Sequence, residues 1–257
     1  MMRAPTAALL LACLLAPHAA PAQAFSPAPA LAQASGQFTP AQREEIVAIV
    51  RAALRSDPSI LRDAVIALQA DEGVRQDAAM RAAIAASREG LTRDGGDPVA
   101  GNPGGDVTIV EFFDIRCPYC RRLVPVLDDL LSRDRGVRLV LKDLPILGPP
   151  SVLGAKALLA AQRQGGYVKL QEALMRDSAP LTEEALRRQA AAIGLDWDRL
   201  QRDMADPAIQ RHLDADLALA HGLNIQGTPA LIIGDKLIPG AVELAELEQA
   251  VAAARGH

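Results

Sequence analysis

Apolar residues recur at helical spacing through the first third of the chain. Thr39-Pro40 is typical of the cap and first residue of a helix, and Asp57-Pro58 repeats this start signal. An alanine-rich third helix is expected from Asp71 to about Thr92. The sequence therefore predicts a helical N-terminal region over residues 37–93. Its first two helices carry apolar stripes at Ile46, Ile49, Val50, Ala53 and Leu54, then at Ile60, Leu61, Ala64, Val65 and Leu68.

The helical region ends at a cluster of helix-breaking residues. Asp94-Gly95-Gly96-Asp97-Pro98 indicates a domain boundary. The helices before it form too short a segment to bury two apolar stripes by themselves. They can pack on the following domain or on copies of themselves, and we expect self-association.

A change to alternating and continuous apolar runs predicts a β-sheet after this boundary. A short strand is expected around Val99, and a longer one over Val107–Phe113. The longer strand has apolar residues on both faces, so it should be central in the sheet. Its alternation places Glu111 on one face with Ile109 and Phe113, which predicts a buried carboxylate.

The rest of the pattern completes a small mixed sheet. A strand is expected over Val137–Leu141, followed by a long helical stretch at about 149–222. Ala230–Ile233 and Leu237-Ile238 then read as a hairpin, and a final helix is expected at about Val242–Ala254. The fold class is therefore α/β, with an inserted group of helices.

Length and composition allow one large domain or two small ones with an aliphatic core. Half of the 257 residues are apolar but only 3% are aromatic, so Leu, Ile, Val and Ala must build the core. The formal net charge of -4 argues against a nucleic-acid partner.

The first residues have the pattern of an export signal. Arg3 provides a positive start, Ala7–Ala16 an apolar core, and Ala22-Gln23-Ala24 a cleavage site of small residues. Residues 1–24 are thus expected to be a signal peptide and residues 25–36 a disordered lead, although Ala32-Gln33-Ala34 is a second candidate cleavage site. Removing the signal peptide also removes Cys13, which leaves one pair of cysteines.

That pair, in Cys117-Pro118-Tyr119-Cys120, lies where the central strand passes into a helix. Cys117 is expected at the helix N-terminus, where unpaired N–H groups and the helix dipole favour a thiolate. Pro118 suits the first helical position, and Cys120 lies one turn in, where it can resolve a mixed disulfide formed at Cys117. A bridge over four residues would add little stability, and a zinc site would need further ligands. The motif therefore favours redox chemistry.

Glu111 precedes the dithiol closely, and two interpretations of it remain open. It can take up the proton of Cys120, or it can pair with a basic neighbour such as Lys142 on the next strand.

Together these motifs resemble the DsbA family of bacterial periplasmic thiol-disulfide oxidoreductases. The resemblance covers roughly Asp97 to His257 and rests on the segment Glu111–Cys120, on Gly227-Thr228-Pro229, and on the helical insertion between them. It implies a thioredoxin fold in which Pro229 is cis and faces the dithiol. It also implies that Pro229 and the Thr228 backbone position a client strand beside the sulfurs.

Two departures from DsbA refine this expectation. DsbA has His inside its CxxC motif and Val before the cis-proline, whereas this chain has Tyr119 and Thr228. Thr228 is similar to the residue in disulfide isomerases, and the helical extension is similar to the ScsC and Com1 branches. The resemblance therefore implies an isomerase or reductase that acts as a homo-oligomer, with a trimer expected, and a dithiol oxidase as the alternative.

The resemblance also sets expectations for partners. Disulfide-containing client proteins are the expected substrates, with a membrane redox partner of the DsbD type for an isomerase or of the DsbB type for an oxidase. No metal or organic cofactor is required. Glutaredoxins share the CPYC motif, but the export signal and the insertion argue against that class. The alternative from another class is a copper-tolerance protein that binds Cu(I) through both thiolates.

Overall fold

A computed structural model describes residues 38–92, 96–177 and 179–256 of the chain. The expected signal peptide and lead lie outside these residues. The chain divides into two compact units, residues 1–68 and 69–257, and each is described by itself. Across the described residues, none of the helices combines the length and the apolar character that spanning a membrane would require.

The first unit consists of helix α2, Pro40–Ser56, and the start of helix α3, Ser59–Ala86. The Thr39 side chain accepts a hydrogen bond from the backbone N–H of Gln42, whose own side chain accepts one from the N–H of Thr39. This capping box explains why the helix begins there. The large apolar side chains of the unit are exposed: Phe38, Ile46, Val47, Ile49, Val50, Leu54, Ile60, Leu61, Val65, Ile66 and Leu68.

The second and third predicted helices are one helix, so the expected start at Asp71 is wrong. Helix α3 continues to Ala86, and a short helix α4, Arg88–Leu91, follows it. No proline interrupts the chain between Leu68 and Asp71. Gly73 lowers the helical propensity of this segment but does not end the helix, which runs through it.

The second unit is built on a mixed sheet whose described strands lie in the order β1-β3-β2-β4-β5. Strand β2 is central, as its two apolar faces predict, because it pairs in parallel with β3 and antiparallel with β4. This sheet confirms the expected α/β class. The strands are β1 (Val99–Gly101), β2 (Val107–Phe113), β3 (Val137–Asp143), β4 (Ala230–Ile233) and β5 (Lys236–Pro239).

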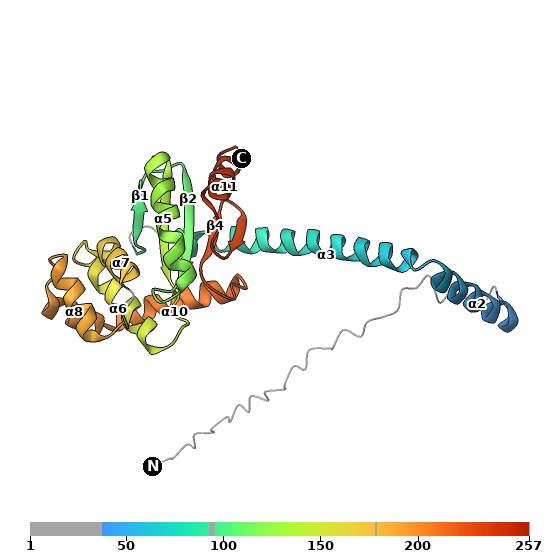
Figure 1. Cartoon of the computed structure of the whole chain (residues 1–257), viewed down its shortest axis with the longest axis horizontal. Helices are drawn as coiled ribbons and strands as arrows, with labels where there is room; N and C mark the ends of the chain where they lie inside the picture. The colour runs from blue at the N-terminus through green and yellow to red at the C-terminus, as the bar shows by residue number, and fades with distance from the viewer. Residues whose placement is uncertain (1–37, 93–95, 178, 257) are drawn as a thin grey trace, which may run out of the picture. The chain divides into compact units, whose positions relative to one another are not determined.

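Helices cover this sheet, and a group of them is inserted between β3 and β4. The inserted group runs from α6 to α10 and is drawn yellow to orange in Figure 1. The α/β class with inserted helices therefore agrees with the expectation. The helices are α5 (Pro118–Arg133), α6 (Pro149–Gln162), α7 (Tyr167–Arg176), α8 (Glu183–Ala192), α9 (Trp197–Met204), α10 (Pro207–Gly222) and α11 (Leu244–Arg255).

Strand β2 separates two apolar layers, because successive side chains of a strand point to opposite faces. Ile109 and Phe113 belong to the larger layer, which includes α5, α11 and the inserted helices. Val110 and Phe112 belong to the other layer, together with apolar residues of α3, α4 and α10: Ile84, Leu91, Ala220 and Leu223. The end of α3 is therefore part of the core of the second unit.

Candidate active site

The dithiol lies where β2 passes into α5. Cys117 is the N-cap of α5 with extended backbone angles (φ -71°, ψ 122°), and Pro118 occupies the first helical turn. Cys120 follows in the same turn and is fully buried, while Cys117 is 5% exposed. The more accessible of the two sulfurs therefore belongs to the residue at the helix N-terminus, the end at which the first N–H groups of a helix have no intrahelical partner.

The loop before β4 meets the dithiol. β4 pairs antiparallel with β2, with Ala230 opposite Phe112, so the loop before β4 meets the segment that follows β2. The Thr228–Pro229 peptide bond is cis, as the resemblance implies. The Sγ of Cys117 donates a hydrogen bond to the carbonyl oxygen of Thr228 at 3.3 Å. A client strand that binds along this loop would thus lie within reach of the sulfur.

Tyr119 occupies the surface beside the sulfurs. Its side chain is 55% exposed, and the guanidinium of Arg122 lies 4.4 Å from the centre of its ring. This cation–π contact holds an aromatic face at the surface of the dithiol turn.

Glu111 is buried on the face of β2 that contacts α5, as the alternation predicts. It is 2% exposed, and burial raises its pKa from 4.5 to about 8. At neutral pH the carboxyl group is therefore mainly protonated, and it can exchange a proton near physiological pH.

Cys120 is held in its thiol form. Its pKa is raised, first by burial and then by the negative charge of Glu111 and of Cys117. Hydrogen bonds with the Asp114 backbone and the Thr228 side chain oppose this shift only in part. Because the raised pKa opposes ionisation of the Cys120 thiol, removing its proton requires an acceptor.

Lys142 does not pair with Glu111. In the β2–β3 register Lys142 lies opposite Phe112, while Glu111 lies opposite Leu141, so the two charged side chains point to opposite faces of the sheet. The interpretation in which Glu111 pairs with Lys142 is therefore wrong.

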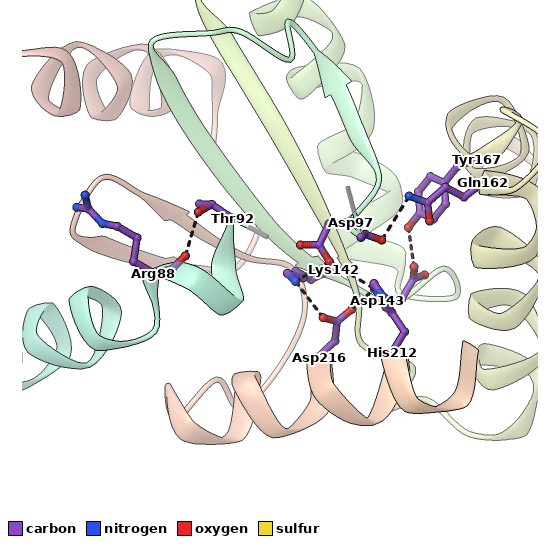
Figure 2. A network of polar contacts seen from close by, with 10 residues as sticks. Arg88, Thr92, Asp97, Lys142, Asp143, Gln162, Tyr167, His212 and Asp216 are labelled. Atoms are coloured by element: carbon purple, nitrogen blue, oxygen red, sulfur yellow. Dashed lines mark hydrogen bonds and ion pairs between the residues drawn. The ribbon is translucent and has the colours of Figure 1, made fainter. Parts of the chain in front are cut away.

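Lys142 instead forms a buried ionic cluster, which Figure 2 shows. Its Nζ lies 2.7 Å from Oδ1 of Asp97 and 3.1 Å from Oδ1 of Asp216. The Nε2 of His212 lies 3.4 Å from Asp97 and 3.3 Å from Asp216. The side chains of Asp97, Lys142 and Asp216 are at most 1% exposed. Strand β3, helix α10 and the start of the sheet domain thus meet at these charges.

This ionic cluster also has the ligand types of a metal site. The ligand atoms of Asp97, His212 and Asp216 lie within 4.8 Å of one another. However, the Lys142 ammonium group contacts both carboxylates and already supplies positive charge to them. We therefore treat the cluster as an ion-pair network that joins three elements.

A second buried polar pair lies beside this network. The hydroxyl group of Tyr167 donates a hydrogen bond of 2.7 Å to Oδ2 of Asp143, as Figure 2 also shows. Burial raises the pKa of both groups well above the usual values. Sequence reasoning missed this pair and the ionic cluster, because Asp97 was interpreted as part of the breaker segment and Asp216 as part of an ordinary helix.

Two models of protein families match parts of this chain. The model of the DSBA-like thioredoxin domain family matches residues 108–252, and that of the copper resistance protein ScsC N-terminal domain matches residues 42–73. Among curated relatives, a Na(+)/H(+) antiporter NhaA 3 of Salinispora tropica is 30% identical over 160 residues, which cover 62% of this chain. The match covers 24% of that antiporter, so the chain spans about a quarter of its length.

Solved structures extend the similarity over more of the chain. A thioredoxin-like oxidoreductase from Silicibacter pomeroyi is 45% identical, with a TM-score of 0.64 over 66% of this chain and 98% of that one. ScsC of Proteus mirabilis in a transitional conformation is 29% identical, with a TM-score of 0.63 over 85% of this chain and 99% of that one. The family model covers more than half of the sequence, including the dithiol and the cis-proline loop. The chain therefore belongs to the DSBA-like thioredoxin domain family.

Proposed function

We propose that this protein is an exported thiol-disulfide oxidoreductase that acts on the disulfides of other proteins. The observation that carries the proposal is the contact between the Cys117 sulfur, at the N-terminus of α5, and the carbonyl oxygen of Thr228 beside the cis-proline. It places a nucleophilic sulfur next to a backbone segment on which an extended client can bind.

The exchange proceeds in two steps through the two sulfurs. The Cys117 thiolate attacks one sulfur of a client disulfide, which forms a mixed disulfide and releases the other client sulfur as a thiolate. Cys120 then attacks the Cys117 sulfur, releases the client and leaves a Cys117–Cys120 disulfide. The client gains two electrons and the dithiol loses two. In isomerisation the freed client thiolate attacks another client disulfide, and the thiolate released there attacks the client sulfur bound to Cys117. Cys117 leaves as a thiolate, and no net electron transfer occurs.

Glu111 serves the second step in this proposal. Cys120 must lose its proton as it attacks, and its raised pKa opposes that loss. The carboxylate form of Glu111, whose pKa is about 8, can accept the proton. Pro118 and Tyr119 shape the dithiol turn, and Thr228 and Pro229 hold the client strand.

The protein is proposed to work as an isomerase or reductase in the periplasm, and as a homotrimer. The export signal at Arg3–Ala24 supports the location. The exposed apolar side chains of α2 and early α3 support self-association, because such a surface is normally covered by a partner. A membrane redox partner of the DsbD type would keep the dithiol reduced, and the alternative, an oxidase, would depend on one of the DsbB type.

Deleting residues 38–68 tests the isomerase assignment. Ile84 and Leu91 lie in the core of the second unit, so the deletion must end before them. We expect the truncated protein to be a monomer that repairs scrambled ribonuclease at least about tenfold more slowly, because one site then acts alone on each client. Its dithiol oxidase activity should be equal to or higher than that of the full chain.

Point variants provide a matched control for this deletion. Leu61→Lys places a charge in the exposed apolar stripe, whereas Gln69→Lys adds the same charge at an exposed polar position. Mass in solution should fall for the first variant and stay unchanged for the second. If the monomeric forms repair scrambled disulfides as fast as the full chain does, the assembly of several sites is not needed and the proposal that isomerisation depends on the homotrimer is wrong.

A copper-binding role is the second candidate. The similarity of residues 42–73 to the N-terminal domain of a copper resistance protein favours it, and two thiolates are suitable ligands for Cu(I). Titrating the reduced protein with Cu(I) and measuring ribonuclease repair in parallel separates the two roles. We expect repair to occur. Tight Cu(I) binding without repair would favour the copper-binding role.

A further inference from the structure

Two arginines flank the dithiol in the sequence, and both line the same pocket. Arg116 directly precedes Cys117, and Arg121 directly follows Cys120. Both line a pocket of about 280 Å³ between the start of α5 and the segment that joins α7 to α8. Its apolar walls include Ile115, Leu174 and Leu181.

The arginines lack a carboxylate partner in this pocket. Asp177, the acidic residue in its wall, accepts hydrogen bonds from the Ala179 backbone N–H and from the Gln189 side chain, each at 2.9 Å. These two hydrogen bonds lower the pKa of Asp177 more than the charge of Arg121 does, and within the described part of the chain Arg121 makes no salt bridge of 4.0 Å or less with Asp177. The carboxylate of Asp177 is thus occupied by groups other than Arg116 and Arg121.

Arg121 in particular is left with an unmet donor. Its Nε is buried and has no hydrogen-bond partner among the described residues. Arg116 donates from Nη1 to the carbonyl oxygen of Leu147 at 3.5 Å, which is a long contact. A buried donor without a partner is costly, and a guanidinium group binds a carboxylate through strong, directional hydrogen bonds.

We propose that this pocket is a carboxylate-binding subsite that selects substrates with an acidic group close to the reacting disulfide. The proposal rests on the proposed function, since it concerns the substrate bound at Cys117. Arg116 and Arg121 would hold the carboxylate, and Ile115, Leu174 and Leu181 would contact the aliphatic part of the same side chain. The carboxylate can belong to an Asp or Glu residue of a client polypeptide or to a small acidic thiol peptide.

The test compares the rates at which the reduced protein cleaves three peptide disulfides that differ only in the residue next to cysteine: Glu, Gln or Lys. We expect the Glu peptide to react about tenfold faster than the Gln peptide at low salt, the order of size of one charge-assisted hydrogen bond. Arg121→Gln should reduce this ratio to nearly one. Arg116→Gln, a substitution at an exposed position, should also reduce the Glu-to-Gln ratio. This variant provides the same test if Arg121→Gln does not fold.

Arg122→Gln is the matched control. It removes the same charge one position further along α5, but Arg122 contacts Tyr119 and does not line the pocket. The Glu-to-Gln ratio should therefore persist in this variant. Equal ratios in the Arg121 and Arg122 variants, or no preference in the unmodified protein, would overturn the subsite.

Two further comparisons separate the remaining explanations. The rates of cleavage of glutathione disulfide and of its esterified form show whether a small thiol peptide supplies the carboxylate. A preference for the acidic residue that occurs only with the longer peptides assigns the subsite to polypeptide clients. The three peptides together test the proposed function. If the unmodified protein cleaves none of the three peptides, thiol-disulfide exchange is absent, whereas cleavage without an acid preference contradicts the subsite only.

Discussion

A Glu111→Gln variant is expected to be more stable than the unmodified protein at alkaline pH, by about 3–5 kcal/mol at pH 9. Burial raises the pKa of Glu111 from 4.5 in the unfolded chain to about 8 in the folded protein. Between these values the folded state binds more protons than the unfolded state. The stabilising contribution of the protonated carboxyl group is therefore complete below pH 4.5 and is lost as the pH rises through 8.

Urea unfolding of the reduced protein at pH 5 and pH 9 measures this difference. Glutamine has nearly the same shape as a protonated glutamic acid but does not ionise, so it removes the pH dependence while keeping the packing. The variant and the unmodified protein should have similar stability at pH 5 and diverge at pH 9. Identical pH dependence in both proteins would mean that Glu111 does not titrate in a buried environment.

The same substitution tests the proposed proton transfer. Because glutamine cannot accept a proton, we expect resolution of a mixed disulfide by Cys120 to slow by about 10²-fold, and its dependence on pH near 8 to disappear. Alkylation of Cys117 provides the control, since its rate should stay within about twofold. An unchanged pH profile of resolution would exclude Glu111 as the proton acceptor.

A Lys142→Met variant is expected to be destabilised by about 3–5 kcal/mol, because it leaves two buried carboxylates without their shared cation. Asp97 and Asp216 contact the Lys142 ammonium group at 2.7 and 3.1 Å, and all three side chains are excluded from solvent. Denaturant unfolding at pH 7 measures the loss.

Two further variants distinguish a lost ion pair from a general effect of the substitution. Lys169→Met changes an exposed lysine of α7 and should alter the stability by less than about 0.5 kcal/mol. Adding Asp97→Asn and Asp216→Asn to Lys142→Met removes the unpaired charges and should recover part of the stability. If the single Lys142 variant is as stable as the unmodified protein, the cluster does not hold the three elements together.

Local sequence signals were sufficient for much of the active site. A strand followed by CxxC and a helix places Cys117 at a helix N-terminus, and Thr39 with Gln42 forms the expected cap of α2. The alternation of β2 also identifies Glu111 as buried. These predictions succeed because a cap and a strand period depend on residues within a few positions of one another.

Other features depend on which segments meet in the folded chain. Lys142 is paired with Asp97, 45 residues away in sequence, and with Asp216 on an inserted helix. No local pattern distinguishes these two aspartates from exposed ones. The parallel register of β2 and β3 turns the Lys142 side chain to the face of the sheet opposite to that of Glu111. Lys142 therefore pairs with the aspartates and not with Glu111.

The amino-acid sequence by itself therefore determined most of the elements, although not the continuous helix α3, together with the dithiol and the family resemblance. The tertiary structure alone decided the partners of Lys142 and the pocket that Arg116 and Arg121 line. The physical reason is that secondary structure follows from short-range backbone and side-chain preferences. The environment of a buried charge, in contrast, depends on strand register and on helix packing over long separations in the chain.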